Sequence, residues 1–223
     1  SWIYVATDTY RLNDSIMNFP IKNQPVITTF PYLQNFEAND GYFYAEGSNS
    51  SWEYGTPNSP KIDHAASGSK AWKTRLQGNY NKLEYSYLYS PCFDIGSMSN
   101  PTLSFSLATD IEDPSASVFD VAFVEYSHDG HTWIKLGQAG NGTNWYNNSS
   151  EQAWTKTGED YWHVATIPLP KEAPIVSFRF VLRSDQGTEY EGIAVDDIHV
   201  YDLAHPIFDQ SQFTTPVTQN IAA

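Results

Sequence analysis

The sequence is poor in cysteine, and this scarcity removes several classes of site. Cys92 is the only cysteine among the 223 residues, so the chain cannot form an internal disulfide, a CxxC redox pair or a cage of thiolates around a metal. It lies in the stretch YSPCFDI, between residues typical of β-strands. We therefore expect a buried and unreactive thiol.

Basic residues are also scarce. The chain has 12 Lys and Arg residues against 26 Asp and Glu residues, which gives a formal net charge of −14 at pH 7. Nucleic acids and anionic membrane surfaces require a basic protein surface, so neither is expected as a partner. The acidity suits a secreted protein or one that binds divalent cations, while most individual carboxylates are expected to be solvated.

Membrane spans, leader segments and catalytic motifs are absent as well. No stretch is long and apolar enough to insert into a membrane. Ser1 begins the chain in a strand-like stretch without a signal peptide, so we expect a mature or excised piece of a longer protein. The chain has no HExxH pattern, no GxSxG elbow and no Gly-rich phosphate loop. Several carboxylates are paired in the sequence, but linear spacing does not establish a glycosidase pair. We therefore predict that the protein is not an enzyme.

Alternating apolar and polar residues dominate the long segments that are present. In PIVSFRFVLRS, which spans residues 174–184, and in PTLSFSLAT, which spans residues 101–109, every second side chain is apolar. This pattern predicts half-buried β-strands. Clusters of Gly, Asn, Pro and Ser separate the strands and predict long loops. The fold class is therefore all-β, an antiparallel β-sandwich of jelly-roll type.

The ends of the chain differ from this central part. SWIYVATDT and SIMNFPIKNQ can form two strands, but two strands alone do not make a stable domain in water. Residues 1–28 are therefore predicted to be a short N-terminal β extension or the tail of a preceding Ig-like domain. Residues 29–203 form the predicted jelly-roll domain, and residues 204–223 a linker or tail.

The stretch SHDGHTW, residues 127–133, predicts a hairpin. Asp129-Gly130 favours a tight turn between the strand-like stretches VEYS and TWIKLG. We expect Trp133 to pack on the strand that follows the turn.

Loop aromatics leave two alternatives open. Trp145 and Tyr146 lie in a loop rich in Gly and Asn, and Trp52 and Tyr54 lie in another. Beside Asn and Asp these rings could stack on sugars, which would make the chain a carbohydrate-binding module. In the other alternative they cap the ends of the core, where a buried aromatic ring contributes a large apolar area.

The stretch GIAVDDIHVYD, residues 192–202, reads as a strand with Asp196 and Asp197 in its middle. Side chains alternate between the two faces of a strand, so Asp197 is predicted to share a face with Val195 and His199, and Asp196 the other face with Ala194 and Ile198. One carboxylate is then buried. A buried carboxylate must be paired, protonated or bound to a metal.

Several stretches together resemble one family. They are FPYLQNFEANDGYFYAEGSNSSWEYGTP, ASGSKAWKTRLQGNYNKLEYSYLYSPCFDI, NPTLSFSLATDIED, VEYSHDGHTWIKLG, NWYN and EGIAVDDIHV, in this order. The set resembles the MAM-like jelly-roll domains of large secreted bacterial surface proteins, which are related to the cleaved-adhesin modules of gingipain-type proteases. The resemblance covers roughly residues 30–202. It implies a non-enzymatic accessory module, often attached to proteases or adhesins, with structural calcium.

The resemblance also indicates candidate cation ligands. The family's FE matches Phe36-Glu37 and its DD matches Asp196-Asp197, while the tryptophan that usually follows the family's DG turn is replaced here by Tyr42 and Phe43. In a jelly-roll the first and last strands can lie side by side, which would bring these carboxylates together. Calcium takes about 6–8 oxygen ligands, so we predict a structural Ca²⁺ site. Its predicted residues are Glu37, Asp40, Asp196 and Asp197.

One alternative to the metal site stays open, in which one aspartate accepts backbone N–H groups while the other faces solvent.

The predicted function is an extracellular adhesion or interaction module, secreted or on the cell surface. Its partners would be a protein or a glycan there, together with other domains of the parent chain.

Overall fold

The computed structural model describes residues 24–112, 119–156 and 158–203. Within these ranges the chain forms strands and loops, and no helix there is long and apolar enough to cross a membrane. The predictions made for residues 1–23 and 204–223 lie outside the described residues. The strands are β1 (Val26–Ile27), β2 (Tyr32–Gln34), β3 (Tyr44–Ser48), β4 (Trp52–Gly55), β5 (Ala71–Thr74), β6 (Tyr85–Tyr89), β7 (Cys92–Asp94), β8 (Pro101–Asp110), β9 (Val121–Ser127), β10 (Ile134–Lys135), β11 (Glu159–Pro168), β12 (Ile175–Arg183) and β13 (Gly192–Asp202).

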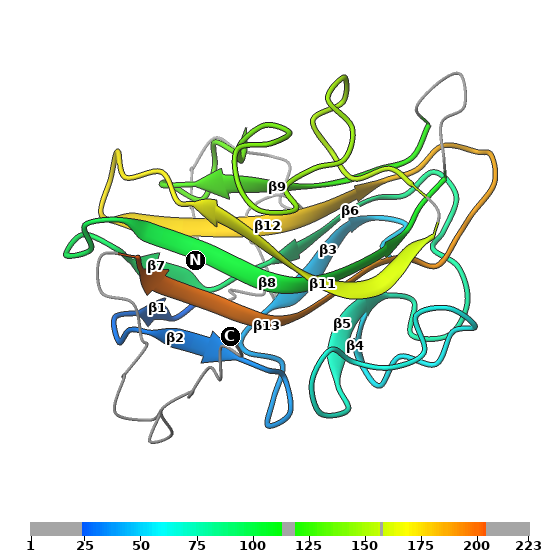
Figure 1. Cartoon of the computed structure of the whole chain (residues 1–223), viewed down its shortest axis with the longest axis horizontal. Helices are drawn as coiled ribbons and strands as arrows, with labels where there is room; N and C mark the ends of the chain where they lie inside the picture. Colours follow the sequence, from blue (N-terminus) through cyan, green and yellow to red (C-terminus); the bar gives the residue numbers. More distant parts are fainter. Residues whose placement is uncertain (1–23, 113–118, 157, 204–223) are drawn as a thin grey trace, which may run out of the picture.

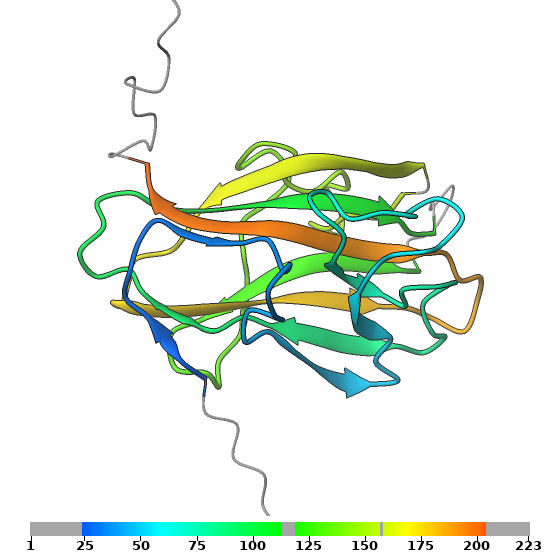
Figure 2. The same cartoon turned by 90° about the horizontal axis from the view of Figure 1, so that it is seen from below.

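The strands form two sheets that pack face to face, as the two views in Figures 1 and 2 show. The seven-stranded sheet has the order β1-β7-β12-β6-β3, with β9 beside β12 and β10 beside β9. The six-stranded sheet has the order β11-β8-β13-β5-β4, with β2 beside β13. The predicted all-β sandwich of jelly-roll type is confirmed.

One pairing departs from the antiparallel pattern. Strand β1 pairs with β7 in parallel, with Val26 opposite Cys92. Because β1 enters from the N-terminal segment and is not joined to β7 by a hairpin, its direction is not fixed by a tight turn. Residues 26–27 thus already belong to the sandwich, next to the predicted boundary at residue 28.

The core is built from the predicted alternating residues and is rich in aromatic rings. On β12, Val176, Phe178, Phe180 and Leu182 are fully buried. They face Phe105 and its neighbours on β8, and the rings of Phe105 and Phe180 meet edge to face at 4.9 Å. Such contacts between the sheets hold the two layers together.

The alternation predicted for β13 breaks in its middle. The register with β8 shifts between Asp196 and His199, and Asp197 has a φ of 47°, in the left-handed region. This β-bulge inserts an extra residue into β13. The side chains after the bulge therefore point to the opposite face from the one that simple alternation predicts. The prediction that Val195 and Ile198 point to opposite faces is therefore wrong. The core-facing residues on both sides of the bulge are Ile193, Val195, Ile198 and Val200.

The predicted hairpin at residues 127–133 is confirmed. Ile134 on β10 lies opposite Tyr126 on β9, and Asp129 Oδ1 accepts hydrogen bonds from the backbone N–H groups of His131 and Thr132. The prediction for Trp133 is wrong: its ring packs across the sheet against Tyr89 of β6, with ring centroids 5.4 Å apart, and beneath Arg179 of β12, and not on the strand that follows the turn.

The thiol of Cys92 lies on β7 and is partly exposed, where full burial was expected. Strand β7 lies between β12 and the two-residue β1, in which Val26 is opposite Cys92. Partial burial still raises the pKa of Cys92, which keeps the thiol protonated and weakly reactive.

Candidate functional site

The first and last parts of the sandwich meet near the predicted calcium ligands. Strand β2 pairs with β13, with Gln34 opposite Ile198, and this brings the segment that contains Glu37 toward the bulge of β13. The segment 66–70 contacts both. Ser67 donates its backbone N–H to Asp196 Oδ2 at 3.0 Å, and Ser69 donates its backbone N–H to Glu37 Oε1 at 2.8 Å. The predicted proximity of the terminal strands is confirmed.

Asp196 is the carboxylate that the bulge buries. It is 0% exposed, and its oxygens accept the backbone N–H groups of Ser67 and Asp197, the latter at 2.7 Å. Burial, followed by the charge of Asp197, raises the pKa of Asp196 to about 7. Within the described ranges no Lys or Arg forms an ion pair with it. An ionised Asp196 is therefore stabilised only by N–H dipoles.

The other predicted ligands have partners of their own. Asp197 accepts hydrogen bonds from the hydroxyl groups of Ser67 at 2.7 Å and Ser106 at 3.2 Å. Two backbone N–H groups, from Ser69 and Lys70, lower the pKa of Glu37. The exposed Asp40 accepts the backbone N–H of Tyr42 at 3.0 Å.

These four residues do not form a single cluster in the structure. Among the described residues, one set of three His, Cys, Asp or Glu side chains brings its ligand atoms within 4.8 Å of one another, and it does not include Glu37, Asp40, Asp196 or Asp197. The segment 66–70 supplies N–H groups to both Glu37 and Asp196. Calcium at these residues therefore stays a prediction.

The set that does cluster is Glu112, Asp120 and Asp185, which we call the acidic triad. Glu112 follows the end of β8, Asp120 precedes β9, and Asp185 follows β12. The pairing of Val121 with Arg183 brings Asp120 and Asp185 together at one end of the sandwich. Sequence reasoning missed this set because its members are separated by 8 and 65 positions and meet only through strand pairing.

The triad has the chemistry of a cation site. Asp120 is 1% exposed and accepts hydrogen bonds from the Tyr80 hydroxyl at 2.5 Å and the Asp185 backbone N–H at 2.7 Å. Burial raises the pKa values of both Asp120 and Glu112, and the charge of Asp185 adds to this effect. Glu112 Oε2 is buried and has no hydrogen-bond partner among the described residues. An oxygen-rich cluster with an unsatisfied oxygen fits a hard divalent cation.

The aromatic residues predicted to bind sugar lie in or against the core. Trp145 is 1% exposed, Tyr146 and Trp52 are each 6% exposed, and Tyr54 is half-buried. The indole N–H of Trp145 donates to the Leu136 carbonyl at 3.0 Å. The burial supports the core-capping alternative, since these rings offer little face to a ligand.

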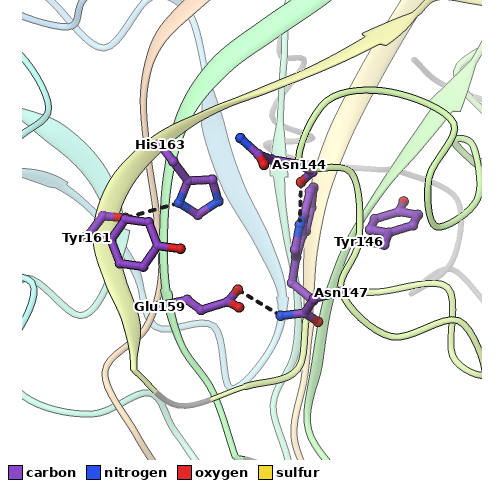
Figure 3. Close-up of a pocket in the computed structure, with 7 residues that line it drawn as sticks. Asn144, Tyr146, Asn147, Glu159, Tyr161 and His163 are labelled. Carbon is purple, nitrogen blue, oxygen red and sulfur yellow. Dashed lines mark hydrogen bonds between the residues drawn. The ribbon is translucent and has the colours of Figure 1, made fainter.

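A pocket opens beside Tyr146, between β11 and the loop that precedes it, with a volume of about 280 Å³. Figure 3 shows Glu159, Tyr161 and His163 of β11 on one side and Asn144, Tyr146 and Asn147 of the loop on the other. Thr143 pairs with Thr166 along the edge of β11, and Gly142 permits this approach because a Cβ there would lie 1.8 Å from the Thr166 carbonyl oxygen. The lining residues are Asn144, Tyr146, Asn147, Trp154, Glu159, Tyr161 and His163.

The pocket combines an open aromatic ring with polar groups. Tyr161 is 62% exposed, and its ring lies 5.2 Å from that of His163. His163 Nδ1 contacts the Tyr161 carbonyl at 3.1 Å, and Asn147 donates to Glu159 Oε2 at 2.9 Å. Sequence reasoning treated YWHVATIPL only as a strand. The sequence did offer a sign of this pocket, because Tyr161 and His163 are two positions apart and therefore share one face of the strand.

Comparisons with known proteins find one distant relative and several solved structures that are similar to this chain. No family model matches it. Bacillopeptidase F from Bacillus subtilis (strain 168) is 29% identical over 186 residues, which cover 82% of this chain. The chain spans only 11% of the length of that relative.

Two of the similar solved structures are β-1,4-galactotriose-bound and cleaved-adhesin domains. The first is TmCBM61 in complex with β-1,4-galactotriose, with a TM-score of 0.49 and 12% identity over 76% of this chain and 94% of that one. The second is the K1 cleaved-adhesin domain of Lys-gingipain from Porphyromonas gingivalis W83, with a TM-score of 0.44 and 13% identity over 78% of this chain and 99% of that one. This domain is one of the cleaved-adhesin modules that the sequence resembles.

Proposed function

We propose that this chain is a non-catalytic adhesion or interaction module of a larger secreted or cell-surface protein, and that calcium stabilises its fold. The single observation that carries the calcium part is the acidic triad. It gathers three carboxylates whose ligand atoms lie within 4.8 Å of one another, and Glu112 Oε2 has no hydrogen-bond partner within the described ranges. A bound dication would remove the repulsion between these groups and fill the unsatisfied position.

The buried carboxylates support a structural role for the acidic residues. Glu84 accepts hydrogen bonds from Ser51 and Ser86, and Glu191 accepts the backbone N–H groups of Lys61 and Ile62. Such carboxylates hold loops in place and are not available to act on a substrate. The match to a small part of bacillopeptidase F supports the view that the module belongs to a longer chain.

Calcium titration tests the proposal. A cation that binds only the folded state stabilises it by mass action, by about 2.7 kcal/mol at 100 times the dissociation constant. The melting temperature should therefore rise with calcium and fall with EDTA, and elemental analysis should find bound calcium. An unchanged melting curve without bound calcium would overturn the calcium part of the proposal.

Variants separate the two candidate cation sites. Asp185→Asn should abolish the calcium response if the triad binds the ion. Asp196→Asn and Glu37→Gln should abolish it if the ion binds beside the bulge. Glu172→Gln is the matched control, because its side chain is 71% exposed and Glu172 precedes β12, whereas Asp185 follows the other end of that strand.

A further inference from the structure

We propose that the pocket between β11 and the 144–154 loop binds a neutral sugar residue of a glycan. The assignment rests on the proposed function as an interaction module and names the chemistry of one partner. Sequence reasoning placed a possible sugar site on rings that are buried, whereas this pocket presents a different ring, Tyr161, which is 62% exposed.

The first argument is the shape and size of the pocket. Its volume of about 280 Å³ suits one small ring more than an extended peptide. The buried rings of Tyr146 and Trp154 border the pocket, and they meet edge to face at 4.7 Å. This pair is anchored in the core, so the wall that it forms is rigid. A rigid pocket lowers the entropy lost on binding.

The second argument is the exposed ring. In Figure 3, Tyr161 and His163 stand on β11 and face the pocket opposite Asn144 and Asn147. A tyrosine combines an apolar ring with a polar tip, and sugars likewise combine apolar C–H faces with hydroxyl groups. The Tyr161 hydroxyl and His163 Nε2 have no hydrogen-bond partner among the described residues. They are therefore available to bind sugar hydroxyls.

The third argument is charge. No Lys or Arg lines the pocket, and Glu159 contributes a carboxylate. A net charge of −14 further disfavours an anionic ligand such as a sialylated, uronate-bearing or phosphorylated compound. A cationic ligand is disfavoured as well, because Glu159 is already engaged by Asn147 at 2.9 Å and by Lys156 at 3.6 Å. A neutral sugar is the class that remains.

A glycan array with neutral and with sialylated or uronate-bearing oligosaccharides tests the inference directly. The full chain should bind neutral glycans and leave the anionic ones unbound. The strongest neutral oligosaccharide on the array then becomes the probe for isothermal titration calorimetry. Binding of anionic glycans alone, or of none, would overturn the inference.

Variants test the location of the site. Tyr161→Ala should weaken binding of the probe by about tenfold, which corresponds to about 1.4 kcal/mol, since the substitution removes the exposed ring. Glu159→Gln should change binding by less than about threefold for a neutral sugar, because the amide keeps one acceptor oxygen. A large loss with Glu159→Gln would show a cationic ligand and contradict the assignment.

Tyr42→Ala is the matched control, since Tyr42 is 63% exposed and lies outside the pocket. Equal loss in Tyr161→Ala and Tyr42→Ala would also contradict the assignment. Calcium-dependent melting is measured on the same samples. Absence of glycan binding with an intact calcium response would leave the proposed function standing, whereas loss of both would overturn the two proposals together.

Discussion

At the scale of single residues, Asp196 shows how a fully buried carboxylate can be kept without a basic partner. Its oxygens accept N–H groups from Ser67 and Asp197, and burial still raises its pKa to about 7. A pKa raised above the unfolded value means that the folded state holds its proton more tightly. The contribution to stability is therefore complete below about pH 4 and is lost as the pH rises through 7.

We therefore expect the free energy of unfolding in EDTA to fall between pH 4 and pH 7. A shift from 3.8 to about 7 corresponds to at most about 4 kcal/mol, and water near the half-buried Asp197 will reduce this figure. The raised pKa values of Glu112 and Asp120 act in the same direction. Urea unfolding at several pH values measures the slope, which Asp196→Asn should make shallower. A slope that is unaffected by this substitution would assign the effect to other groups.

Lys73 is a second buried charge, and it is held by oxygen atoms. The side chain is 0% exposed, and its ammonium donates to the carbonyls of Arg75 and Glu191 at 2.8 and 2.9 Å. Thr74 O and Ser59 Oγ complete the set of acceptors. Burial lowers the pKa of Lys73 to about 8. The ammonium thus joins β5 to the start of β13 through backbone oxygens.

Lys73→Met should destabilise the protein by about 3 kcal/mol, because it leaves several buried carbonyl groups without a donor. Lys82→Met is the control, since the Lys82 side chain is 50% exposed and its ion pair with Glu189 at 3.4 Å is a surface contact. Chemical denaturation of both variants provides the comparison. Equal stability of the two variants would show that the oxygen cage contributes little.

At the scale of elements, the loop between β10 and β11 is held by its aromatic residues. Trp145 packs against Phe105 at 5.8 Å and against Trp154 at 5.3 Å, and the Tyr146 hydroxyl donates to the Leu136 carbonyl at 2.9 Å. The loop is therefore an extension of the core.

Trp145→Ala should reduce the free energy of unfolding by about 3–5 kcal/mol, as for other large buried rings. Trp133→Ala, on the partly exposed hairpin, should cost less. Differential scanning fluorimetry can rank the two variants. A smaller effect at Trp145 than at Trp133 would contradict the core-capping role.

The sequence predicts the regular elements better than the irregular ones, and particular residues show why. Phe178 lies between Ser177 and Arg179, and Phe180 follows two positions later, so the inward direction of both rings follows from the period of a strand. The bulge at Asp196 and Asp197 has no such periodic signal, because it depends on the pairing with β8. The acidic triad was missed because its three residues also come together only through strand pairing. Tyr161 was missed because its exposure depends on the loop beside β11.

At the scale of the whole molecule, charge is distributed unevenly between interior and surface. Within the described ranges the buried carboxylates belong to Glu84, Asp110, Asp120, Glu191 and Asp196, and the buried ammonium to Lys73. Lys61 pairs with Asp110 at 2.7 Å, but the other carboxylates rely mainly on hydroxyl and N–H groups. A chain with a net charge of −14 is therefore destabilised by its own repulsion when no cation is bound.

This excess of negative charge makes two effects of added salt separable. In EDTA, raising NaCl from about 0.05 M to about 0.5 M should raise the melting temperature, because the screening length falls well below the size of the domain. At constant ionic strength, calcium should add a further increase that magnesium does not match, since a carboxylate cluster accommodates the flexible coordination of Ca²⁺ more readily than the strict octahedron of Mg²⁺. Asp185→Asn should keep the response to NaCl and lose the response to calcium if the triad holds the ion. If calcium and magnesium raise the melting temperature equally, in the unsubstituted chain and in Asp185→Asn, divalent ions act on this molecule only by screening.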